Sequence, residues 1–134
     1  DAQARLLAAF GRDPAWGPNH ACLARFSAAF GRGDQAAIMA LMSDDARFES
    51  TSPAPDGRPY LGAAAIGQVW QEIFAGTREP SFTEEEMFVC GDRGVLRWRF
   101  AWQDDSGTPG HVRGVDVLRF RDGLVTEKLS YVKG

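Results

Sequence analysis

Hydrophobic and polar residues alternate with a period of two along segment 95–103, VLRWRFAWQ. One face of this segment carries Leu96, Trp98, Phe100 and Trp102, and the other carries Arg97 and Arg99. Successive side chains of a β-strand point to opposite faces, so the pattern predicts a strand that is buried on one side only. Another strand is predicted over 81–90, before a turn at 91–94.

The same alternation runs from His111 to Lys133, where HVRGVDVLRFRDGLVTEKLSYVK predicts two strands joined as a hairpin. A three-residue loop, 121–123, is expected because Gly123 readily adopts the left-handed backbone conformation that such a loop needs. The cross-strand pairs that follow from this loop are Phe120 with Leu124, Leu118 with Thr126, and Asp116 with Lys128. Opposite residues share one face of a sheet, so an acid and a base are expected side by side on an otherwise apolar face.

Upstream of the strands, apolar residues recur at the spacing of amphipathic helices. Helices are predicted over 2–10, 18–30, 35–42 and 63–75, and short strands over 47–50 and 60–61. Asp34 is the expected N-cap of the third helix, which Ser43-Asp44-Asp45 is expected to end. Helices that precede long antiparallel strands indicate an α+β domain whose helices cover one face of a curved sheet. Residues 1–18 are interpreted as an N-terminal helical extension, and residues 19–134 as the domain itself.

Composition narrows the possible functions. A chain of 134 residues suits one domain with one core. A net charge of −3 without a basic block argues against nucleic-acid binding. No apolar run approaches the roughly 20 residues that span a bilayer, so no membrane segment is expected. Cys22 and Cys90 lack metal-ligand spacing, which favours two reduced, buried thiols in a cytoplasmic protein. No metal site and no phosphate-binding glycine loop are expected, and therefore no cofactor.

Three segments in this order resemble the NTF2-like superfamily, in its SnoaL-like and ketosteroid-isomerase-like branch. They are RGDQAAIMALMSDDARFES, GAAAIGQVW and GVDVLRFRDGLVTEKLSYVKG, and the resemblance covers about Asn19 to Lys133. It implies a cystatin-like α+β cone, with about three helices packed on a curved antiparallel sheet and a pocket between the two. It also implies a homodimer formed through the convex sheet face. It does not specify a function, because this fold hosts isomerases, cyclases, dehydratases, epoxide hydrolases and non-catalytic domains.

The resemblance also implies roles for individual residues. Asp116 falls where ketosteroid isomerases carry an Asp that donates to a substrate oxyanion, and Lys128 falls where they present an apolar residue. Asp116 and Lys128 are therefore the candidate catalytic residues. The candidate ligand-binding residues are Phe26, Phe30, Ser50, Trp70, Trp98, Phe100 and Leu118. Together they predict an aromatic pocket for a flat, apolar small molecule. The alternative is that the aromatic residues form ordinary core and that the charges form a structural ion pair.

Two departures from the family pattern argue against steroid isomerisation by the usual mechanism. The position of the isomerase general base is Ser50, and a serine without a neighbouring base cannot shuttle a proton as a carboxylate does. The oxyanion-binding tyrosines are replaced by Phe26, Met42 and Trp70. In addition, a cation at Lys128 favours ionised Asp116, which accepts hydrogen bonds and cannot donate one.

Three functions remain open from the sequence. The first is a cofactor-independent enzyme of isomerase, cyclase or lyase type that transfers a proton on an apolar cyclic or polyketide-like substrate, with Asp116 as base and Lys128 tuning it. The second is a non-catalytic carrier or sensor that uses the same pocket. The third is a homodimeric association domain with a closed core. The expected dimer face carries Arg97, Arg99, Arg113, Arg119 and Glu127, together with Glu85, among Val115, Val117, Leu129 and Tyr131.

Overall fold

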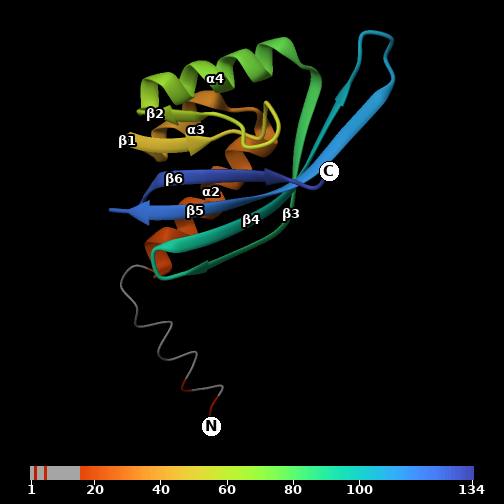
Figure 1. The fold of residues 1–134 in the computed structure, drawn as a ribbon. Helices are drawn as coiled ribbons and strands as arrows, with labels where there is room; N and C mark the ends of the chain where they lie inside the picture. The colour runs from red at the N-terminus through yellow and green to blue at the C-terminus, as the bar shows by residue number, and fades with distance from the viewer. Residues whose placement is uncertain (1, 3–4, 6–15) are drawn as a thin grey trace.

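The computed structural model describes residues 2, 5 and 16–134, which form one six-stranded sheet with helices on one side (Figure 1). The helices are α2 (Trp16–Arg32), α3 (Gln35–Ala40) and α4 (Ala63–Gly76). The strands are β1 (Met42–Glu49), β2 (Pro59–Leu61), β3 (Arg78–Cys90), β4 (Arg93–Gln103), β5 (Pro109–Arg121) and β6 (Leu124–Val132). The predicted α+β class is confirmed. The helix predicted over 2–10 lies almost entirely outside the described residues.

The strand order is β2-β1-β6-β5-β4-β3, and every neighbouring pair is antiparallel except β1 with β6. The prediction that Ser43-Asp44-Asp45 ends the third helix was wrong, because α3 already ends at Ala40 and these residues lie inside β1. The backbone N–H of Val125 donates to the Leu41 carbonyl oxygen at 2.8 Å, at the start of the β1–β6 pairing. Pairing with a distant strand therefore outweighs the local preference for a turn. The predicted cap is confirmed, since the Asp34 carboxylate accepts from the Ala37 N–H at 3.1 Å.

The register predicted for the last hairpin was wrong. The turn has two residues, Asp122 and Gly123, both with positive φ (54° and 73°), and a bulge then shifts the ladder after Arg119. The observed pairs are Phe120 with Val125, Leu118 with Lys128, and Asp116 with Ser130. The shorter turn and the bulge together displace the register by two residues. Because the side-chain period is also two, Lys128 stays on the same face as Asp116.

The core fills the space between the helices and the concave sheet face. Its fully buried members include Leu23, Phe26, Ile38, Ile66, Leu118 and Val125. On α4, Ile66 and Trp70 are buried, as the helical spacing predicts. On β4, Leu96 and Trp98 are buried while Arg97 and Arg99 are exposed, so the face predicted from alternation is confirmed.

Candidate functional site

A cavity of about 280 Å³ lies between the helices and the concave face of the sheet. Seven of the nine candidate residues line it: Phe30, Ser50, Trp70, Trp98, Phe100, Asp116 and Lys128. Phe48 and Phe82 also line it, and Phe82 stacks on Phe100 with ring centroids 4.5 Å apart. An aromatic wall with a few polar groups is the usual composition of a small-molecule site.

Phe26 and Leu118, the other two candidates, do not line the cavity. Phe26 is completely buried and packs edge-to-face against Phe30, with ring centroids 5.0 Å apart. Leu118 is 1% exposed and lies opposite Lys128 in the ladder. Both belong to the core, where they support residues that do reach the cavity.

Three polar side chains meet at one place on the cavity wall. The ammonium Nζ of Lys128 lies 3.3 Å from Oδ2 of Asp116, and both side chains are 3% exposed. Ser130 connects them, because its hydroxyl accepts from Lys128 at 2.7 Å and donates to Oδ1 of Asp116 at 2.7 Å. The two charges are thus joined directly and also through one hydroxyl.

Sequence reasoning missed Ser130. It is two residues after Lys128, so the alternation already placed it on the same face. The predicted register hid its role, because it placed Lys128 rather than Ser130 opposite Asp116. In the structure the cross-strand partner of Asp116 is Ser130, and Lys128 reaches Asp116 diagonally.

Aromatic rings surround the Lys128 ammonium. Its Nζ lies 4.6 Å from the ring centroid of Phe48, 4.9 Å from that of Trp70 and 5.6 Å from that of Phe30. Aromatic faces attract cations, most strongly where water is excluded. Trp70 adds a polar group of its own, since its indole Nε1 is buried and has no hydrogen-bond partner among the described residues.

Burial lowers the pKa of Lys128 below its ordinary value of 10.5, although the Asp116 carboxylate acts in the opposite direction. Burial dominates because moving an ammonium out of water disfavours its charged form.

This lowered pKa predicts a pH-dependent stability. Between the lowered pKa of the folded state and 10.5, the unfolded chain binds one proton more than the folded chain at this side chain. The free energy of unfolding should therefore rise with pH across this interval, by up to about 1.4 kcal/mol per pH unit. Urea denaturation of the wild type and of Lys128→Met at a series of pH values checks this. Parallel pH profiles for the two proteins would contradict it.

The family follows from a comparison of the sequence. Residues 23–128 match the family model described as a SnoaL-like domain. The chain belongs to the SnoaL-like family. Among curated proteins, no match was found.

Solved structures share the fold of this SnoaL-like domain. An NTF2-like protein of unknown function from Mesorhizobium loti is 37% identical, with a TM-score of 0.78 over 91% of this chain and 96% of that chain. A protein from Xanthomonas campestris, provisionally named a polyketide cyclase, is 18% identical, with a TM-score of 0.76 over 89% of this chain and 93% of that chain. A protein from Catenulispora acidiphila with a ketosteroid isomerase-like fold, solved in complex with trimethylamine, is 18% identical, with a TM-score of 0.71 over 82% and 83%.

The described part of the SnoaL-like domain has no group of three or more His, Cys, Asp or Glu side chains that is arranged to hold a metal ion. Cys22 and Cys90 are both free, and Cys90 is exposed rather than buried. None of the helices in the described ranges is long and apolar enough to cross a bilayer.

Ser50 lines the cavity, but its hydroxyl is engaged by the loop between β1 and β2. It donates to the Ser52 carbonyl oxygen at 2.8 Å and accepts from the Arg58 N–H at 3.0 Å. These bonds hold the part of the loop that contributes Ser50, Thr51 and Ser52 to the cavity wall. The Ser50 hydroxyl therefore anchors the loop between β1 and β2.

Gly57 closes this loop, and its substitution should damage the cavity. Its φ is +68°, and a Cβ added there would lie 1.8 Å from the backbone oxygen of Ser50. We expect Gly57→Ala to displace the loop and to weaken ligand binding about tenfold or more, because the clash is with backbone that cannot rotate away. Titration calorimetry with any ligand of the cavity measures this, with Gly134→Ala as the control because a Cβ there meets nothing within 4 Å. Equal affinity in both variants would show that the loop does not shape the site.

Proposed function

We propose that this SnoaL-like domain binds a flat, apolar small molecule in the aromatic cavity and transfers a proton on it, with Asp116 as the base. The observation that carries this proposal is the buried group of Asp116, Ser130 and Lys128 on the cavity wall. Charged groups taken out of water are costly, and they are often found at functional sites. The class of reaction is an isomerisation, cyclisation or elimination without a cofactor.

Each of the three side chains has a role in such a reaction. An ionised Asp116 carboxylate accepts a proton from carbon next to a ligand carbonyl group. Lys128 has three N–H donors, and Ser130 and Asp116 engage two of them, so one remains for a ligand oxygen. That donor stabilises the negative charge that develops on the oxygen as the proton leaves. Ser130 holds Asp116 and Lys128 at a fixed separation.

A thermal shift screen against flat aromatic ketones tests binding. A ligand at a hundred times its dissociation constant adds about 2.7 kcal/mol to the free energy of unfolding. The matched control for each ketone is the same ring system with a methylene group in place of the carbonyl. If neither the ketones nor their methylene controls stabilise the protein, the binding proposal is wrong.

Proton exchange tests catalysis. The wild type should exchange the acidic carbon-bound protons of a bound ketone with deuterated water, as followed by NMR. Asp116→Asn should slow this exchange by about 10²–10⁴-fold, since it removes the base and keeps the size of the side chain. Binding without exchange in the wild type would sink the enzyme proposal and leave a carrier.

The carrier is the second candidate, and one observation favours it. The Ser50 hydroxyl, at the position of the isomerase base, is bonded within its own loop. The third candidate, a closed association domain, is harder to reconcile with a 280 Å³ cavity beside both charges.

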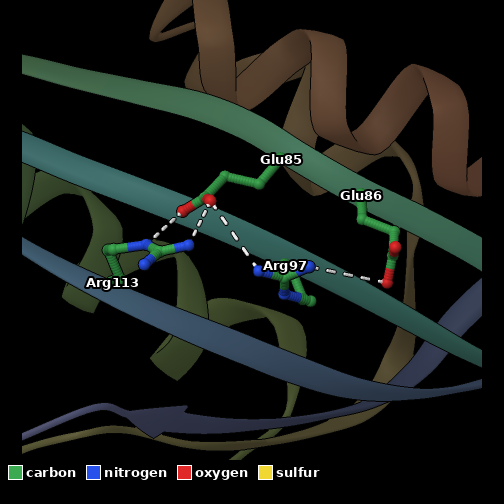
Figure 2. Close-up of polar contacts among 4 residues, drawn as sticks. All are labelled: Glu85, Glu86, Arg97 and Arg113. Atoms are coloured by element: carbon green, nitrogen blue, oxygen red, sulfur yellow. Dashed lines mark hydrogen bonds and ion pairs between the residues drawn. The ribbon is translucent and has the colours of Figure 1, made fainter.

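For the partner, we propose a homodimer through the convex sheet face. Glu85 on β3 lies between two arginines, with its carboxylate 2.6 Å from Nη2 of Arg113 and 3.8 Å from Nη2 of Arg97, which also reaches Glu86 (Figure 2). Val117 and Tyr131 are exposed on the same face. Ordered charges around exposed apolar side chains suit a partner surface. Light scattering at tens of micromolar should give twice the chain mass, and a monomer mass would remove this proposal.

A further inference from the structure

Lys128 is chemically unusual among the amines of this chain. The sequence has only two lysines, Lys128 and Lys133. Lys133 is exposed at the end of the chain, whereas Lys128 is buried and lines the cavity. A lysine held in an apolar pocket is the usual setting of an amine that acts as a nucleophile. The reacting form is the neutral amine, so such a lysine also needs a group that takes its proton.

That acceptor is present at Asp116. The direct path from Nζ to Oδ2 is 3.3 Å, and the path through the Ser130 hydroxyl has two steps of 2.7 Å each. Moving one proton from the ammonium to the carboxylate converts a buried ion pair into two neutral groups. Burial in the aromatic surroundings lowers the pKa of Lys128, so its ammonium gives up a proton more readily than it would in water.

We propose that Lys128 forms a Schiff base with an aldehyde or ketone that enters the cavity. This inference rests on the proposed small-molecule function of the same cavity. Asp116 first takes one proton from the Lys128 ammonium. The free amine then adds to the carbonyl carbon, and the resulting carbinolamine loses its hydroxyl group as water with the proton that Asp116 returns. The products are a protonated imine and one water, and the Asp116 carboxylate becomes the counter-ion of the imine.

The charge balance of the site supports this step. Before the reaction one cation faces one anion, and after it the protonated imine faces the same carboxylate. No buried charge is created or lost, so the reaction avoids the cost of leaving Asp116 unpaired. The three rings that lie 4.6–5.6 Å from Nζ also line the cavity, so a flat carbonyl compound that reaches Lys128 meets aromatic side chains there.

Reductive trapping tests the inference. The protein is incubated with 2-naphthaldehyde and sodium cyanoborohydride, which reduces an iminium to a stable amine, and the product is located by peptide mass mapping. We expect the adduct on Lys128 to form about tenfold faster than on Lys133, because the neutral amine is the reacting form and burial lowers the pKa of Lys128. In Lys133→Arg the adduct should persist, because Lys128 is then the only lysine. In Lys128→Arg it should disappear.

The inference does not depend on whether Lys128 variants fold, because Lys133→Arg tests it alone. Labelling of Lys133 or of the terminal amine in preference to Lys128 in the wild type would overturn it. An excess of 2-ethylnaphthalene, which has the ring system but no carbonyl, should slow labelling of Lys128 only. Thermal stabilisation by ketones without any adduct on Lys128 would overturn the covalent step and leave the proposed binding function intact. If ketones neither stabilise the protein nor form an adduct on Lys128, both the covalent step and the proposed binding function are wrong.

Discussion

Lys128→Met is expected to lower the free energy of unfolding by about 3–5 kcal/mol, because it leaves the Asp116 carboxylate buried and unpaired. Asp116→Leu should destabilise the protein by a similar amount, because it leaves the Lys128 ammonium buried and unpaired. The double variant, which places two apolar side chains of similar size in the same space, should recover most of the loss. Chemical denaturation of the four proteins gives the double-mutant cycle directly.

The exposed ion pair of Arg121 with Asp45 is the matched control. Both side chains are more than half exposed, so Arg121→Met should change stability very little. A double variant at Asp116 and Lys128 that is as unstable as either single variant would mean that packing, rather than charge pairing, dominates this part of the core.

Gly114→Ala should destabilise the fold by about 1–3 kcal/mol and distort the cavity wall, as overpacking of a filled site does. An added Cβ would lie 2.4 Å from the ring of Trp98, its cross-strand partner, and 2.6 Å from the backbone oxygen of Tyr131. Trp98 lines the cavity, so its displacement should also weaken ligand binding. Thermal denaturation and calorimetric titration measure the two effects.

Gly76→Ala is the control for this substitution. It ends α4, and a Cβ there meets nothing within 4 Å. The same exchange should therefore be neutral or slightly stabilising at this position. If Gly114→Ala behaved like Gly76→Ala, the tight contact between β4 and β5 would not constrain Trp98.

Alternation was the most dependable signal in the sequence. It placed Trp98, Asp116 and Lys128 on the inner face even though the hairpin register was wrong, since the error was an even number of residues. The bulge after Arg119 left no signal that the prediction could use, and it lies where β6 pairs with both β5 and β1.

Depth within the core was less predictable. Phe26 and Phe30 lie one helical turn apart on the same face of α2, yet only Phe30 reaches the cavity. That difference depends on how far α2 sits from the sheet, which no local pattern encodes. For the same reason Ser130 became a member of the site only when the pairing of β5 with β6 was known.

The position of β6 between β1 and β5 has a consequence for biosynthesis. Ser43 and Thr126, whose hydroxyls lie 3.2 Å apart, are separated by 83 residues. During synthesis, β1 and β2 therefore lack the strand that pairs with β1, which is β6, until residues 124–132 have emerged from the ribosome. Such non-local pairing slows folding, and the nascent chain meanwhile presents an open strand edge that chaperones are suited to protect.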